Sequence, residues 1–132
     1  MPQKTPEKLG HRSSSASGAN PPLPVFSYAE LHCISNFTFL RGASFPEELV
    51  ETADALGYHA IAITDECSLS GVVRAHVAAK KLGIKLIIGA EFIFHEEAEG
   101  SKGSCHLVLL ARSRTGYGEL SHLITCARRE SK

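Results

Sequence analysis

The chain has 132 residues, of which 43% are hydrophobic and 21% are charged, and its formal net charge is zero. This length allows one domain with a modest core. The balanced charge excludes a basic footprint for nucleic acid over the chain as a whole. No apolar run approaches the roughly 18 residues that a membrane span needs, and none of the cysteines forms a CxxC pair. We therefore expect a cytoplasmic globular protein with reduced thiols and no membrane contact.

The N-terminal part of the chain differs in composition from the rest. Residues 1–24 are rich in serine and proline and bury too little apolar area to offset their ordering entropy, which predicts a disordered leader. Residues 25–132 then form the domain, and residues 28–35 are expected to be its first strand. A helix is predicted to start at Ser44 as its cap, with Pro46 in the first turn and Glu47 three residues after the cap. Its apolar face would consist of Leu49, Val50, Ala53 and Leu56.

Residues 60–64 are a continuous apolar run, which suits a strand buried on both faces. A second helix is predicted over residues 71–82, and Gly83 would end it. Its packed side would carry Val72, Val73, His76 and Val77. The remaining elements are expected to be strands over residues 85–89 and 91–95, a turn over 99–103, a strand over 105–111 and a helix over 116–129.

This order, β-α-β-α-β-β-β-α, predicts an α/β fold with parallel strands and right-handed crossovers. A closed barrel of such units needs about 250 residues, so roughly half of a (β/α) barrel is expected here. Active groups in these folds gather at the carboxyl ends of the strands.

Metal-capable side chains stand inside or directly after the predicted strands. Candidate ligands are His32, Asp65, Glu66, Glu91 and His106. Imidazole and carboxylate ligands suit zinc, manganese or iron, and a bound metal could polarise a phosphate oxygen or generate hydroxide.

Each candidate also has an ordinary structural interpretation. His32 could be a half-buried, hydrogen-bonded histidine, and His106 could be a histidine of an edge strand. Asp65 could serve the loop that follows its strand, and Glu91 could be a buried carboxylate with a partner. Four arginines near the C-terminus, Arg112, Arg114, Arg128 and Arg129, could form a phosphate-binding patch or simply a solvated helix end.

The same segments resemble the PHP (polymerase and histidinol phosphatase) domain of bacterial C-family DNA polymerases. The family's His-x-His strand corresponds to residues 31–35, and its Thr-Asp-His strand end corresponds to residues 62–66. Its Gly-x-Glu motif corresponds to residues 89–91. Its fourth motif corresponds to His106 and the apolar strand after it, followed by Gly116-Tyr117. Residues 28–44 and 62–76 are similar to the error-prone, translesion class in particular.

Two positions depart from the pattern that the resemblance implies. Ile34 stands where the first motif has its second histidine, and Glu66 stands where the second motif has histidine. Later family ligands and the catalytic carboxylates of the polymerase palm have no counterpart in this sequence. The resemblance therefore implies an incomplete PHP domain over residues 25–132 with a degenerate metal site. Such a site would hold zinc or manganese weakly or not at all.

Three functions follow from the resemblance. In the first, the chain is the PHP portion of an error-prone DNA polymerase that replicates DNA and repairs it by synthesis past lesions. The parent would use magnesium in its palm, which is absent here, and this portion alone would be inactive. The second function is a metal-dependent phosphoesterase or 3′–5′ exonuclease module, and the third is an inactive gene fragment. Expected partners are the remainder of the polymerase, DNA through that remainder, and a sliding clamp or mutagenesis accessory proteins.

Overall fold

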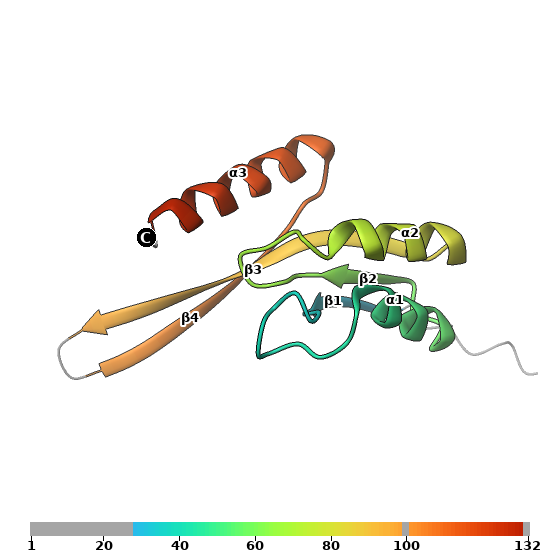
Figure 1. The fold of residues 1–132 in the computed structure, drawn as a ribbon, viewed down its shortest axis with the longest axis horizontal. Coiled ribbons are helices and arrows are strands. Elements are labelled where there is room, and N and C mark those ends of the chain that lie inside the picture. The colour runs from blue at the N-terminus through green and yellow to red at the C-terminus, as the bar shows by residue number, and fades with distance from the viewer. Residues whose placement is uncertain (1–27, 99–100, 131–132) are drawn as a thin grey trace, which may run out of the picture.

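The computed structural model describes residues 28–98 and 101–130, so the predicted leader over residues 1–24 lies outside the described residues. Strands and helices alternate at first and then give way to a hairpin and a final helix (Figure 1). The elements are β1 (Ala29–Cys33), α1 (Pro46–Ala55), β2 (Ala60–Ile63), α2 (Val72–Leu82), β3 (Lys85–Ala98), β4 (Ser101–Leu110) and α3 (Arg114–Glu130).

The strands form one curled sheet in the order β1-β2-β3-β4, which confirms an α/β half-barrel. The β1–β2 and β2–β3 pairs are parallel, but β3 and β4 are antiparallel. Parallel pairing is thus wrong for the last pair. The physical reason is that β3 and β4 follow each other without a helix, and a direct connection can join only antiparallel neighbours. Figure 1 shows the two strands as a long arm that extends away from the other elements.

One long strand replaces the two that were predicted over residues 85–89 and 91–95. Residues 85–88 of β3 pair with β2, and residues 89–98 pair with β4. The change of partner falls at Gly89. A Cβ atom at this position would lie 2.6 Å from the Leu109 carbonyl oxygen and 2.8 Å from Thr64 Cγ2. Glycine is therefore required where the strand passes from one neighbour to the other.

The helix ends also follow local chemistry. Helix α1 begins after Phe45 and not after Ser44, and the Glu48 carboxylate accepts the Phe45 N–H at 2.9 Å. The expected cap and its partner Glu47 are therefore each displaced by one residue. Gly83 ends α2 as predicted, with φ of 84° and its N–H donated to the Ala79 carbonyl.

Two apolar clusters hold the sheet to its helices. Helices α1 and α2 pack with β2 through Val50, Ala53, Ile61, Ile63, Ala75, Ala78 and Ala79. Helix α3 packs on β3 through Ala90, Phe92, Leu120 and Ile124. All four residues of β2 are buried, as the apolar run predicted. No helix among the described residues is long and apolar enough to cross a membrane.

The predicted packed sides of the first two helices are partly wrong. Val73 and Val77 of α2 are 72% and 63% exposed, while the alanines of α2 are buried. Leu56, beyond the end of α1, is 62% exposed. Because α1 and α2 pack closely against each other, small side chains occupy the contact and the larger valines remain outside.

Helix α3 offers a stabilising substitution. Ser113 Oγ accepts the Gly116 N–H at 3.1 Å, so the helix starts two residues before the predicted start at Gly116. Gly118 lies inside the helix, is exposed, and a Cβ there would meet no atom within 4 Å. We expect Gly118→Ala to raise the free energy of unfolding by about 0.5–1 kcal/mol, because alanine loses less backbone entropy in a helix. Urea denaturation followed by circular dichroism would measure this, and a lower midpoint would contradict it.

Candidate functional site

The sheet brings residues of β1 and β4 and the segment after β2 together around Glu91, which lies in the middle of β3. Beyond the end of β2, Glu91 N–H is donated to the Asp65 carbonyl at 3.1 Å, and Cys67 N–H is donated to the Glu91 carbonyl at 2.8 Å. These bonds form an isolated parallel bridge between Glu66 and Glu91. On the other side, His106 of β4 lies opposite Ile93, two residues along the ladder from the Glu91–Val108 pair.

Glu91 is the centre of the resulting cluster, and its side chain is 0% exposed. Its Oε1 lies 2.7 Å from His106 Nδ1 and 3.7 Å from His32 Nε2. Burial opposes ionisation of Glu91, but hydrogen bonds from Arg41 and His106 and the charges of Arg41 and His32 outweigh it. The pKa of Glu91 therefore lies below its usual value, and the carboxylate is ionised at neutral pH.

Arg41 occupies the other side of this carboxylate. Its Nη1 lies 2.8 Å from Glu91 Oε2 and also 2.8 Å from Glu66 Oε2. Hydrogen bonds and charge from Glu91 and then Glu66 raise the pKa of Arg41 above its usual value, so the guanidinium is permanently charged. No role for Arg41 was predicted from the sequence. A single arginine in the segment after a strand is not distinctive, and only the loop geometry aims it at the carboxylates.

Asp65 does not join this cluster. It is 1% exposed, and its carboxylate accepts the Ser35 N–H at 2.6 Å, the Ser35 hydroxyl at 2.8 Å and the Thr38 hydroxyl at 2.8 Å. Thr38 Oγ1 in turn accepts the Glu66 N–H at 3.0 Å. These contacts make Asp65 a structural carboxylate that orders a neighbouring loop, which is close to the alternative to a metal ligand that the sequence had left open.

The loop that Asp65 holds, residues 35–44, presents Arg41. The Asn36 N–H is donated to the Ser44 carbonyl at 2.9 Å, which closes the loop at its base. Leu40, directly before Arg41, has φ of 65°, in the left-handed region that leucine disfavours. Such a conformation persists because the surrounding hydrogen bonds hold it.

Four of the five predicted metal ligands lie near one another, around Glu91. His32, Glu66, Glu91 and His106 carry suitable donor atoms. Arg41 connects Glu66 to Glu91, and Glu91 contacts both histidines. Yet the guanidinium takes one oxygen of each carboxylate, and Asp65 is occupied by the loop. Over residues 28–98 and 101–130, no group of three or more His, Cys, Asp or Glu residues is arranged to hold a metal ion. The donor set as it stands does not fit a metal, because a cation already lies among the carboxylates.

The four C-terminal arginines do not form one patch. Arg114 opens α3, and Arg128 lies near its other end, which corresponds to about 21 Å along a helix with a rise of 1.5 Å per residue. Arg128 Nε is donated to the Cys67 carbonyl at 2.8 Å, which ties α3 to the loop after β2. The arginines therefore act at separate places.

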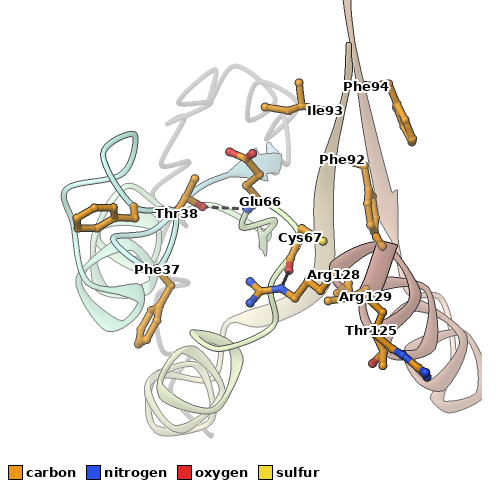
Figure 2. Close-up of a pocket in the computed structure, with 13 residues that line it drawn as sticks. Phe37, Thr38, Glu66, Cys67, Phe92, Ile93, Phe94, Thr125, Arg128 and Arg129 are labelled. Atoms are coloured by element: carbon orange, nitrogen blue, oxygen red, sulfur yellow. Dashed lines mark hydrogen bonds between the residues drawn. The ribbon is translucent and has the colours of Figure 1, made fainter. Parts of the chain in front are cut away.

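A groove of about 990 Å³ borders the cluster at Glu66. Figure 2 shows Phe37 and Thr38 on one side of it and Phe92, Phe94 and the end of α3 on the other. Its lining combines apolar side chains with Glu66, Arg128 and Arg129, and His32 and His106 do not contribute to it. The groove thus lies beside the predicted ligands and does not contain them.

The comparisons with known proteins agree with this fold. The sequence matches the PHP domain family over residues 30–132, and the chain belongs to that family. It is 61% identical over 105 residues to the error-prone DNA polymerase of Dechloromonas aromatica, and the match covers 80% of this chain and 10% of that protein. It is 59% identical over 109 residues to the error-prone DNA polymerase of Ralstonia nicotianae, covering 81% of this chain and 10% of that protein. The family resemblance found in the sequence is thereby confirmed.

The chain spans about a tenth of the length of these curated relatives. Among solved structures, a Bifidobacterium adolescentis protein assigned as a metal-dependent phosphoesterase superposes with a TM-score of 0.58 at 27% identity, over 81% of this chain and 35% of that chain. An amidohydrolase from Chromobacterium violaceum superposes with a TM-score of 0.56 at 24% identity, over 73% of this chain and 33% of that one, and shows the shared fold alone.

Proposed function

We propose that the chain serves as a non-hydrolytic structural part of an error-prone DNA polymerase. The relatives named as error-prone DNA polymerases support the polymerase context. The observation that carries the non-hydrolytic role is the position of Arg41, whose Nη1 lies 2.8 Å from both Glu66 and Glu91. A phosphoesterase that uses a metal would need those oxygens for the metal.

In this proposal the chain's partners are the remainder of the polymerase and, through it, DNA. The synthesis chemistry, with its magnesium, would reside in parts of the polymerase that this sequence does not match. A sliding clamp and mutagenesis accessory proteins would contact the assembled enzyme. The place of action would be the bacterial cytoplasm, where such a polymerase meets its DNA.

A chimera tests the structural role. The matching region of the Dechloromonas aromatica polymerase would be replaced by residues 28–130 of this chain, and primer extension would be measured on an undamaged template. We expect the chimera to be soluble and to extend primers within an order of magnitude of its parent, because the identity is 61% over 105 residues. A chimera that carries Asp65→Ala should lose solubility or activity. A folded chimera without primer extension would contradict the proposal.

The second candidate function is a metal-dependent phosphoesterase, which is favoured by the Bifidobacterium neighbour and by the convergence of His32, Glu91 and His106. We expect the 132-residue chain with Mn²⁺ or Zn²⁺ to hydrolyse neither bis-p-nitrophenyl phosphate nor a 3′-labelled single-stranded DNA. The measurement is the amount of hydrolysis product released by the chain with metal, compared with the amount released by the metal without the chain. Turnover that disappears in His32→Ala and His106→Ala variants would establish the hydrolytic function instead.

A further inference from the structure

The cluster around Glu91 places two carboxylates and two imidazoles together. Glu91 lies within 3.7 Å of His32 and His106, and Arg41 connects it to Glu66. Two converging carboxylates repel each other unless a positive charge lies between them. Here one nitrogen atom, Arg41 Nη1, is 2.8 Å from an oxygen of each. This nitrogen thus has the bridging position that a shared cation would take.

Hydrogen bonds within the loop over residues 35–44 fix the position of Arg41. The backbone N–H of Arg41 is donated to the Thr38 carbonyl at 3.1 Å, and the Thr38 hydroxyl is donated to the carboxylate of buried Asp65. Leu40 keeps a left-handed conformation beside it. The Arg41 side chain is 35% exposed, whereas the Glu91 side chain that it contacts is fully buried. The loop therefore places the side chain over the cluster from the solvent side.

We propose that Arg41 is a built-in cation that keeps this cluster free of metal ions, and that its removal converts the cluster into a divalent metal site. The donors of the new site would be His32, Glu66, Glu91 and His106. Nitrogen and oxygen donors of this kind suit Zn²⁺ and Mn²⁺. The inference rests on the contacts of Arg41 and goes beyond the proposed structural role, because it assigns a latent ligand set and the residue that blocks it.

The test compares zinc binding by the full chain and its variants. Arg41→Gln removes the charge and keeps an amide that can hydrogen-bond to the carboxylates. After equilibrium dialysis against Zn²⁺, elemental analysis should show about one more zinc ion per chain in Arg41→Gln than in the wild type. Subtracting the wild-type value removes zinc held by other histidines and cysteines. Arg41→Lys retains the positive charge and should show no gain.

Two further variants locate the added zinc. Arg74→Gln removes another arginine that pairs with a glutamate, Glu47, and among the described residues neither partner has a hydrogen bond or ion pair with a histidine. This variant should bind no more zinc than the wild type. The double variant Arg41→Gln/His106→Ala should lose the gain, because one of the two imidazoles is removed. Circular dichroism, recorded for each variant before dialysis, would check that the variant is folded.

Equal zinc content in Arg41→Gln and the wild type would overturn the inference, and so would a gain that survives the loss of His106. Should Arg41→Gln unfold, zinc is expected to restore its circular dichroism signal, and no restoration would equally overturn it. These outcomes are separate from those of the proposed function. The chimera and the hydrolysis assays use wild-type Arg41, so either result there leaves the zinc comparison intact.

Discussion

Replacing Asp65 by alanine is expected to lower the free energy of unfolding by roughly 3–5 kcal/mol, because buried donors lose their acceptor at once. The side chain is 1% exposed, and it accepts one N–H and two hydroxyl groups from Ser35 and Thr38. Alanine leaves these groups inside the protein without the carboxylate that satisfied them. Urea denaturation of the full chain, followed by circular dichroism, measures the change.

The control for this prediction is Asp54→Ala. Asp54 lies on the exposed side of α1, and its side chain has no hydrogen bond among those that the structure describes. Its replacement should change the free energy of unfolding by about 0.5 kcal/mol at most. Asp65→Asn should lie between the two, because the amide keeps the shape and one acceptor oxygen. An Asp65→Ala protein as stable as Asp54→Ala would show that the loop does not depend on this carboxylate.

The Gly42→Ala substitution is expected to have an effect of similar size for a different reason. A Cβ atom at position 42 would overlap the carbonyl group of Ser35 and approach the Asn36 nitrogen to 3.1 Å. These are backbone atoms, so no side-chain rotation relieves the overlap. The loop would have to open, with loss of the Gly42 N–H to Thr38 carbonyl bond of 2.9 Å. We expect a loss of about 3 kcal/mol or more, at the upper end for overpacking.

Gly118→Ala is the matched control, since the same change is made where nothing lies within 4 Å. The two variants should move the urea midpoint in opposite directions. Hydrogen exchange adds a local readout. Compared with the wild type, the amides of residues 35–44 should exchange faster in Gly42→Ala and at the same rate in Gly118→Ala. Two variants with the same midpoint would mean that the loop adapts without strain.

Both predictions concern the one loop that carries Arg41. Asp65 holds the loop from within the protein, and Gly42 lets the chain return close to Ser35. Loss of either should therefore displace the guanidinium from Glu66 and Glu91 as well as destabilise the chain. The position of the cation over the carboxylates is a property of loop folding as much as of Arg41 itself.

Much of the architecture could be predicted from local patterns. The apolar run at residues 60–64 indicated a strand buried on both faces, and β2 is fully buried. Gly83 marked the end of α2, because glycine readily adopts the left-handed conformation in which its N–H is donated to the Ala79 carbonyl. The motifs around His32, Glu91 and His106 identified the family, and their placement on β1, β3 and β4 of one sheet is what brings these side chains into contact. Their role as metal ligands stays a prediction.

Other features depended on contacts between distant parts of the chain. A continuous run of strand-forming residues does not reveal that β3 changes partner at Gly89, because both halves have the same local preference. Valine and alanine both suit a helix that packs, and only the close approach of α1 and α2 selected the alanines.

The cluster itself shows this division most clearly. By itself the sequence determined which donor atoms stand inside or directly after the strands, since alternation and strand position are local properties. It did not determine that Asp65 turns to Ser35 and Thr38, or that Arg41 reaches Glu66 and Glu91. Those choices depend on how the loop over residues 35–44 packs against the segment after β2 and against β3. The hydrogen bonds that tie the loop to Asp65, Glu66 and Glu91 join residues 25 to 50 positions apart.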